Sequence, residues 1–233
     1  MARERGESQK ELNRVPIRDN GEPLVDFLVV CPRLRFAPQH PIFDFPRVHL
    51  VRRSVAEMLC QAAAALPRGL YLNVVEGYRA LPVQRAMYQW ALERARRQYP
   101  TWSEAHLRRE ANRYSAPPDA RTPPPHSTGA AVDVEIVDEN GTVLDFSSPF
   151  GVGDLRQTAP NAPGLSEEAR ANRALLRSVL EPTRLTNYVG EWWHWSYGDS
   201  GWALRVGANH AFYGFVDIPP DAEWIGDMSK LPD

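Results

Sequence analysis

The spacing of hydrophobic residues predicts three helices and a strand in the first half of the chain. Apolar residues recur at helical spacing over residues 50–66, and the β-branched segment 70–75 that follows is typical of a buried strand. Proline suits the first turn of a helix, so Pro82 predicts a second helix that runs to about residue 98. Residues 101–104 have the sequence of a capping box and predict the start of a third, more polar helix.

The hydrophobic pattern changes to period two beyond residue 130. Residues 132–137 largely alternate between apolar and polar side chains, which predicts a strand with one buried face and places Asp133 on the other face. Asn140 and Gly141 form a strong hairpin signal. We therefore expect residues 142–144 to be the returning strand.

A fourth helix and an aromatic strand complete the predicted fold. Ser166 is a good helix cap and Pro182 a good terminator, so we expect a helix over residues 166–180. The aromatic segment 188–197 is too short for an independent helix and favours a strand. Helices and hairpin strands mix without a regular βαβ alternation. This indicates an α+β fold, a single domain with a central, largely antiparallel sheet flanked by helices.

The composition fits one domain of moderate size and excludes two classes of partner. The chain has 233 residues, of which 43% are hydrophobic, and a net charge of −2, so it offers no basic field for nucleic acid. Its longest apolar-biased stretch, residues 56–66, falls short of the ~20 residues that a membrane span needs. We expect residues 1–20 to form a polar, flexible N-terminal segment and residues 21–233 to form the domain.

The N-terminal sequence predicts a cytoplasmic location, and the number of cysteines predicts free thiols. The first twenty residues are rich in charges and contain no hydrophobic run, unlike a secretory signal. Two cysteines are present, Cys31 and Cys60, too few for a disulfide framework in a chain of this size. We therefore expect two buried thiols.

Two segments carry the residue types of a catalytic zinc site. A site of this kind needs three protein ligands drawn from histidine and carboxylate, an open position for water, and a nearby base that is not itself a ligand. His126 and Asp133 in one segment, and Glu191 and His194 in the other, supply that set. Gly129 lets the backbone bend between His126 and the strand that carries Asp133.

Spacing alone leaves other interpretations open. Glu191 and His194 are three residues apart, which places them on opposite faces of a straight strand, so a joint site requires a bend near Trp192. A histidine beside proline, such as His126, is also typical of a surface loop, and a histidine among tryptophans is typical of a hydrogen-bonded core. Arg79 follows a predicted buried strand, where it can bind a carboxylate, stabilise an oxyanion or form a surface salt bridge.

Three motifs, taken in order and with their separations, resemble the zinc D-Ala-D-Ala dipeptidases of the VanX type. They are Gly77-Tyr78-Arg79, then His126 and Asp133 with six residues between them, and then Glu191-Trp192-Trp193-His194. The resemblance extends from residue 50 to residue 197. The superfamily also contains zinc D,D-carboxypeptidases, endolysin-type endopeptidases and the Hedgehog signalling domain, so the resemblance implies their fold.

The resemblance implies a role for each matching residue. His126, Asp133 and His194 are expected to bind one zinc ion per chain, Glu191 to act as general base and Arg79 to stabilise the tetrahedral intermediate. The implied reaction is hydrolysis of a small peptide that contains D-amino acids. The substrate pocket is expected to have an aromatic wall, although at least one tryptophan should face the core. The expected wall residues are Tyr78, Trp192 and Trp193.

Two positions depart from the family pattern. Pro124 stands where family members usually have serine, and Gly151 where they usually have aspartate, and both family residues help to bind the termini of the dipeptide. Asp154 is a candidate replacement for recognition of the amine. The departures predict weaker activity on D-Ala-D-Ala and better turnover of a substrate with a modified or longer amino end.

Three alternatives to a dipeptidase remain open. The first two are a zinc D,D-carboxypeptidase and a peptidoglycan endopeptidase of the same superfamily. The third is a non-catalytic binding module that carries zinc. The presence of Glu191 and Arg79 beside a full ligand set argues against the binding module.

Overall fold

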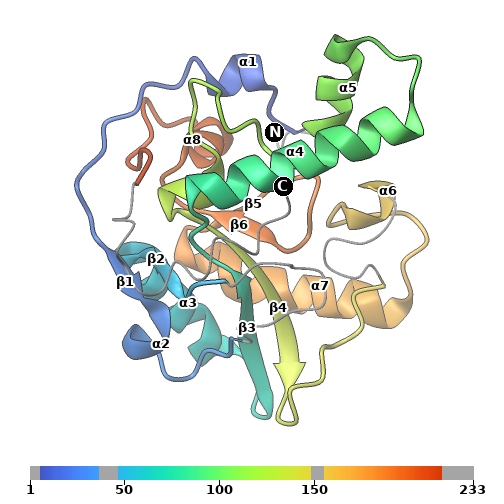
Figure 1. Ribbon diagram of the computed structural model, residues 1–233. Helices are drawn as coiled ribbons and strands as arrows, with labels where there is room; N and C mark the ends of the chain where they lie inside the picture. The colour runs from blue at the N-terminus through green and yellow to red at the C-terminus, as the bar shows by residue number, and fades with distance from the viewer. Residues whose placement is uncertain (1–5, 37–46, 148–154, 217–233) are drawn as a thin grey trace.

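A four-stranded antiparallel sheet lies at the centre of the computed structural model, which describes residues 6–36, 47–147 and 155–216 (Figure 1). Its spatial order is β3-β4-β6-β5, and a separate two-stranded antiparallel sheet joins β1 and β2. The strands are β1 (Leu24–Asp26), β2 (Leu50–Arg52), β3 (Leu70–Glu76), β4 (Ala131–Asp138), β5 (Thr186–Asn187) and β6 (His194–Ser196). The predicted α+β class with an antiparallel sheet is confirmed.

The longer helices lie in two groups around this sheet. Helices α3 (Arg53–Ala65) and α7 (Glu167–Leu180) pack against each other and against β3 and β4. Helices α4 (Leu81–Gln98) and α5 (Glu104–Ala111) form a hairpin beyond the end of β3 (Figure 1). None of the helices in the described ranges has both the length and the apolar character of a transmembrane segment.

Short helical segments complete the described part of the fold. Four are α-helical and two are 3₁₀ turns, and several connect the sheet to its surroundings. They are α1 (Gln9–Leu12), α2 (Phe27–Val30), η1 (Pro125–Thr128), α6 (Leu155–Thr158), η2 (Glu181–Thr183) and α8 (Ser200–Val206).

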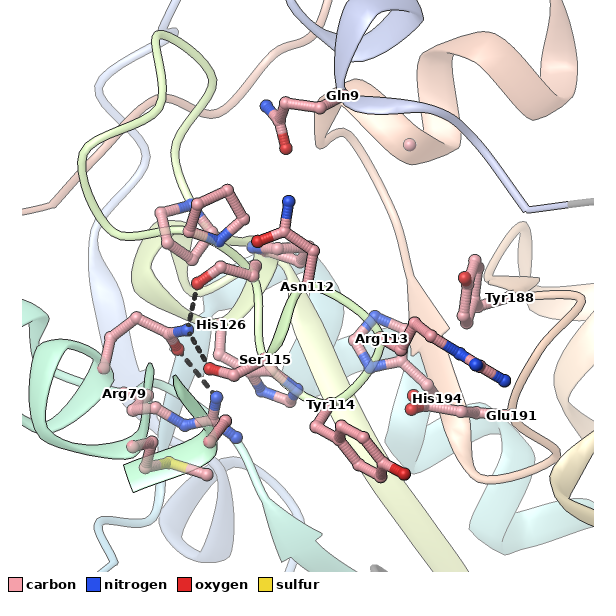
Figure 2. A pocket seen from close by; sticks show the side chains of 18 of the residues that line it. Gln9, Arg79, Asn112, Arg113, Tyr114, Ser115, His126, Tyr188, Glu191 and His194 are labelled. Atoms are coloured by element: carbon pink, nitrogen blue, oxygen red, sulfur yellow. Dashed lines mark hydrogen bonds between the residues drawn. The ribbon is translucent and has the colours of Figure 1, made fainter. Parts of the chain in front are cut away.

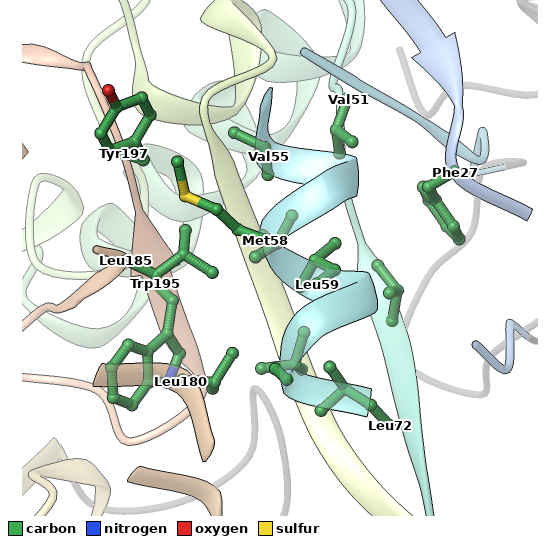
Figure 3. Close-up of a cluster of buried hydrophobic side chains, with 14 of the residues drawn as sticks. Phe27, Val51, Val55, Met58, Leu59, Leu72, Leu180, Leu185, Trp195 and Tyr197 are labelled. Atoms are coloured by element: carbon green, nitrogen blue, oxygen red, sulfur yellow. The ribbon is translucent and has the colours of Figure 1, made fainter. Parts of the chain in front are cut away.

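The apolar face of α3 and the apolar face of the sheet form the main core (Figure 3). Met58 and Leu59 on α3 are buried, as are Val134 and Ile136 on β4 and Trp195 on β6. Burial of each such side chain contributes about 1.5–3 kcal/mol. The core therefore anchors β4 and β6. The polar residues that alternate with these apolar residues point to the opposite face of the sheet.

Two predicted helix starts are wrong. Residues 50–52 belong to β2, where Val51 pairs with Val25, and α3 begins only at Arg53. The polar helix begins at Glu104, after Ser103 in the cap position, and not at a capping box opened by residue 101. The Ser103 hydroxyl contacts His106 Nδ1 at 2.8 Å instead of capping the backbone.

Two of the strand predictions are right in place but too long. The expected returning strand at residues 142–144 is reduced to one bridge, in which Val143 pairs with Val137. The aromatic segment 188–197 contains β6, and a bend at Trp192 and Trp193 precedes it. The predicted bend near Trp192 is thus confirmed.

Cys31 and Cys60 form a disulfide, so the prediction of two buried thiols is wrong. Cys31 ends the short helix α2, and Cys60 lies in α3. Packing of α2 against α3 brings their Cα atoms to 5.4 Å, within the usual range for a disulfide. Spacing in the sequence could not reveal this approach, because it depends on how the two helices pack.

The described part of the N-terminal segment packs onto the domain. Asp19 Oδ2 accepts a hydrogen bond from the buried Arg52 at 2.9 Å, and this pair draws residues 17–19 against the chain near Ala211. Glu7 forms an ion pair with Arg205 at 3.1 Å. These contacts place α1 beside α8 (Figure 1). Residues of α1 lie on the side of the sheet toward which Asp133 points.

Candidate active site and metal centre

Three ligand-type side chains converge from three elements. Asp133 on β4 and His194 on β6 are directly opposite each other in the antiparallel register, so their side chains share one face. His126 comes from η1, which ends at Gly129 with φ of 70°. The left-handed conformation favours glycine there, and a Cβ at Gly129 would also displace Leu24 Cδ2, which lies 2.3 Å away.

The donor atoms of these three side chains fit a metal ion. One donor atom from each of His126, Asp133 and His194 lies within 4.8 Å of the others. His194 Nδ1 is 2.9 Å from Asp133 Oδ1, and His126 Nε2 is 3.4 Å from Asp133 Oδ2. His126 Nδ1 donates to the Gly77 carbonyl at 2.8 Å, which orients the ring with Nε2 toward the cluster. Two imidazoles and one carboxylate form a typical catalytic zinc set.

The charges within the cluster stabilise one another. Burial by itself would raise the pKa of Asp133, but the adjacent His126 and His194 hold that pKa well below its usual range. Burial would lower the pKa of His194, but the hydrogen bond and charge of Asp133 raise it. A deprotonated carboxylate at position 133 is the form that ligates a metal.

Glu191 lies beside this cluster at the bend that precedes β6. Its pKa is raised, first because the group is buried and also because Asp133 is close. The side-chain amide of Asn187 donates to the carbonyls of Glu191 at 2.8 Å and His194 at 3.0 Å. Asn187 thereby fixes the bend that brings Glu191 and His194 to one side. No local pattern in the sequence indicates this role of Asn187.

Arg79 is held in a defined orientation at the other side of the cluster. Its Nε donates to Glu76 Oε1 at 2.7 Å, its Nη2 donates to Glu76 Oε2, and its Nη1 donates to Gln84 Oε1 at 2.7 Å. Arginine has five N–H groups, so one remains on each Nη for a ligand. Burial would lower the Arg79 pKa, but Glu76 raises it.

Sequence reasoning missed the two residues that orient Arg79. Glu76 lies in the same motif as Arg79, but its role shows only in the bidentate contact. Gln84 is buried on α4 and also donates to the Ser115 hydroxyl at 2.9 Å and the Ala116 carbonyl at 2.7 Å. These contacts, dashed in Figure 2, connect Arg79 to the segment after α5.

A cavity of about 620 Å³ opens over the cluster. His126, Asp133, His194, Glu191 and Arg79 all line it. Its remaining walls come from the N-terminal segment, from α4, from the end of α5 and the residues after it, and from the region of β5 and α8. This volume is in the usual range for small-molecule sites.

The predicted aromatic wall is only partly in the cavity. Trp193 lines it, whereas Trp192 is buried and stacks on Phe146 with ring centroids 4.1 Å apart. Tyr78 is buried, donates to the Val216 carbonyl at 2.9 Å and is absent from the described cavity lining. Trp195 belongs to the core, as expected for at least one tryptophan.

Of the two positions that depart from the family pattern, one lies in the described part of the chain and the other does not. Pro124 lines the cavity, where it offers neither a side-chain donor nor a backbone N–H. Gly151 and the candidate amine-binding residue Asp154 lie outside the described residues.

Comparison with known proteins gives a consistent picture. The Peptidase_M15 family model, described as D-Ala-D-Ala dipeptidase, matches residues 42–215. A D-alanyl-D-alanine dipeptidase from Synechocystis sp. is 27% identical over 237 residues, covering 87% of this chain and 95% of the relative. The enzyme of the same name from Escherichia coli is 24% identical over 180 residues, which cover 73% of this chain and 82% of the relative.

Two solved structures also align with the chain. A mutant of the vancomycin resistance D,D-pentapeptidase VanY in complex with Zn(II) has a TM-score of 0.40 and 16% identity, covering 70% of this chain and 82% of that one. VanYB in complex with D-Ala-D-Ala has a TM-score of 0.42 and 16% identity, and the alignment covers 74% of this chain and 89% of that one.

Proposed function

Because this chain belongs to the D-Ala-D-Ala dipeptidase family, we propose that it is a zinc-dependent peptidase that hydrolyses a small peptide of the D-Ala-D-Ala type. The observation that supports this proposal best is the convergence of His126, Asp133 and His194 in a cavity that Glu191 and Arg79 also line. The three side chains would hold the zinc ion, and the other two would act on the substrate.

Each residue has a task that its geometry supports. Zinc in the cluster would polarise the scissile carbonyl and make water a stronger acid. Glu191 accepts a proton from the attacking water and transfers it to the nitrogen of the leaving amine. Arg79 donates its two remaining N–H groups to the carbonyl oxygen as that oxygen gains negative charge. Glu76 and Gln84 hold the guanidinium that carries those N–H groups, and Arg79 lines the cavity.

The cavity volume supports a second candidate within the same reaction class. About 620 Å³ falls within the range that accommodates drug-sized ligands, which are larger than a dipeptide. A D,D-carboxypeptidase or peptidoglycan endopeptidase activity on longer peptides is therefore the alternative. A non-catalytic zinc-bearing module is disfavoured, since such a protein has no need of a buried Glu191 beside an oriented Arg79.

The location of the protein is a separate prediction. The sequence favours the cytoplasm, but the Cys31–Cys60 disulfide argues for an oxidising compartment, because disulfides are rare where thiols are kept reduced. Both compartments are compatible with a small peptide as substrate.

The proposed function is tested with the purified protein. Metal analysis should find about one zinc per chain, and release of D-alanine from D-Ala-D-Ala and from longer D-Ala-D-Ala peptides should stop on chelation and resume with zinc. Glu191→Gln should keep the zinc but lower kcat by on the order of 10² or more. Loss of zinc from that variant would make Glu191 a ligand and contradict the mechanism.

A further inference from the structure

Tyr188 lies in the cavity beside the catalytic cluster and has no role in the mechanism above. It follows β5 directly and lines the cavity. Its ring meets that of His194 edge-on at 6.1 Å, and its backbone N–H donates to the His194 carbonyl at 2.9 Å. In the view of Figure 2, Tyr188 and Arg79 lie on opposite sides of the two histidines.

Two glycines hold the Tyr188 ring in place. A Cβ at Gly6 would lie 2.5 Å from the Tyr188 hydroxyl oxygen, and a Cβ at Gly190 would lie 2.7 Å from its Cε1. No larger residue fits at either position without moving the ring. The Tyr188 ring therefore occupies the space that side chains at positions 6 and 190 would need.

The Tyr188 hydroxyl lacks a protein partner in the described ranges. No hydrogen bond joins it to any residue of 6–36, 47–147 or 155–216, although Tyr188 is half-buried. The hydroxyl is not one of the fully buried polar atoms that lack a partner, so it is reached from the cavity and is free to accept a hydrogen bond there. A ligand in the cavity would supply the missing hydrogen bond.

The charges around this hydroxyl favour a cation. Glu7, from the N-terminal segment, has a side chain only 5% exposed, and Glu191 and Asp199 also line this part of the cavity. The guanidinium of Arg205 pairs with Glu7 and also donates to the Thr186 and Ser196 hydroxyls. In the view of Figure 2, the Arg113 side chain points between Tyr188 and Glu191. The three carboxylates outnumber the guanidinium groups of Arg205 and Arg113, and this balance favours an ammonium group over a carboxylate.

The α5 side of the cavity contributes two guanidinium groups. Arg109 and Arg113, at the end of α5 and just beyond it, line the cavity and are exposed. A substrate carboxylate is therefore favoured at the α5 rim, and the amino end is favoured at Tyr188.

We propose that Tyr188 and Glu7 form the subsite that binds the free ammonium group of the substrate. The ammonium donates hydrogen bonds to the Tyr188 hydroxyl oxygen and to the Glu7 carboxylate. This inference rests on the proposed function. It also revises the expectation, drawn from Gly151, that the protein recognises a free amino end poorly, because the N-terminal segment supplies a replacement.

Tyr188→Phe tests this subsite, since it removes the hydroxyl and keeps the ring between the two glycines. Zinc-loaded wild type and variant are compared on D-Ala-D-Ala and on N-acetyl-D-Ala-D-Ala, which lacks the ammonium charge. We expect KM for D-Ala-D-Ala to rise about 10- to 100-fold, as for loss of a hydrogen bond to a charged group. KM for the acetylated peptide should change less than about threefold, and kcat for both should change little.

Glu7→Gln is the second variant and should act selectively on the same substrate. Its matched control is Glu57→Gln, which removes a charge from the exposed surface of α3 and should alter neither KM. In the Glu191→Gln background, in which hydrolysis is slow, calorimetry should show the same selective loss of D-Ala-D-Ala affinity when Tyr188→Phe is added.

The outcomes separate the inference from the proposed function. Equal losses on both peptides, no change on either, or loss of zinc from Tyr188→Phe would overturn the inference while wild-type hydrolysis leaves the proposed function standing. If zinc-loaded wild type hydrolyses neither these peptides nor longer ones, the proposed function fails, and the inference fails with it.

Discussion

The two walls of the cavity are built in different ways. The ligand wall consists of η1, β4 and β6, in which backbone pairing, buried neighbours and the contact with Gly77 fix His126, Asp133 and His194. The substrate wall consists of residues 7–12, residues 112–117 and Tyr188, which come from a terminal segment and connections. The rigid wall suits chemistry that tolerates little displacement, and the irregular wall suits changes of specificity.

The largest expected effect is on the ligand wall itself. His126→Ala or His194→Ala should abolish stoichiometric zinc binding and lower kcat/KM by on the order of 10³ or more, since each removes one of three donors. Metal analysis and hydrolysis assays measure both. His106→Ala, on the exposed surface of α5, is the control and should retain zinc. Zinc that stays bound at full stoichiometry in the first two variants would refute the ligand assignment.

Arg79 separates loss of catalysis from loss of metal, because it is expected to act on the substrate without binding zinc. Arg79→Ala should retain zinc and lower kcat about 10²- to 10³-fold, the usual loss for one transition-state donor. Steady-state kinetics measures the change in kcat, and metal analysis of the same sample shows whether zinc is retained. Arg85→Ala on the neighbouring helix α4 removes an exposed guanidinium and should have activity close to wild type. A change in KM alone would assign Arg79 to substrate binding.

Gln84 tests how strongly the surroundings of Arg79 matter. Gln84→Ala leaves Arg79 without one of its orienting acceptors and should lower kcat about tenfold with zinc retained. The double variant Arg79→Ala/Gln84→Ala should be no slower than Arg79→Ala, because both remove the same function. Gln89→Ala, exposed on α4, is the control. Additive losses in the double variant would show that Gln84 acts independently of Arg79.

The disulfide should matter least for activity. Cys60→Ala should lower the free energy of unfolding by about 2–4 kcal/mol while kcat/KM stays near wild type, since the bond lies in the core and away from the cavity. Urea denaturation measures the stability, and thiol titration of the unfolded wild type should find no free thiol unless a reductant is added. Two free thiols in oxidised conditions would instead restore the expectation from the sequence.

Long periodic elements are predictable from the sequence, and short ones are not. The strands β3 and β4 and the helices α4 and α7 follow from periodicity and helix-end signals, which act locally. The strand β2 falls inside a predicted helix, because its three residues continue an apolar pattern and only pairing with β1 makes them a strand.

The same distinction applies to the site. His126, Asp133, Glu191 and His194 stand in compact motifs, and the structure brings these predicted residues together. The residues that orient or surround them come from distant parts of the chain. Examples are Gln84 on α4 and Glu7 near the N-terminus, neither of which carries a local pattern. Only the tertiary contacts show that they reach the cavity.

The contacts of Arg52 have a consequence for the order of folding. Arg52 Nε donates to the Thr128 carbonyl at 2.8 Å, across 76 residues of sequence, and its backbone N–H donates to the Gly129 carbonyl at 2.9 Å. The turn that carries His126 is thus held by a strand that lies much earlier in the chain. Contacts of such long range form late, because loop closure must precede them. During refolding, zinc uptake should therefore trail helix formation and report the final docking of β2 against this turn.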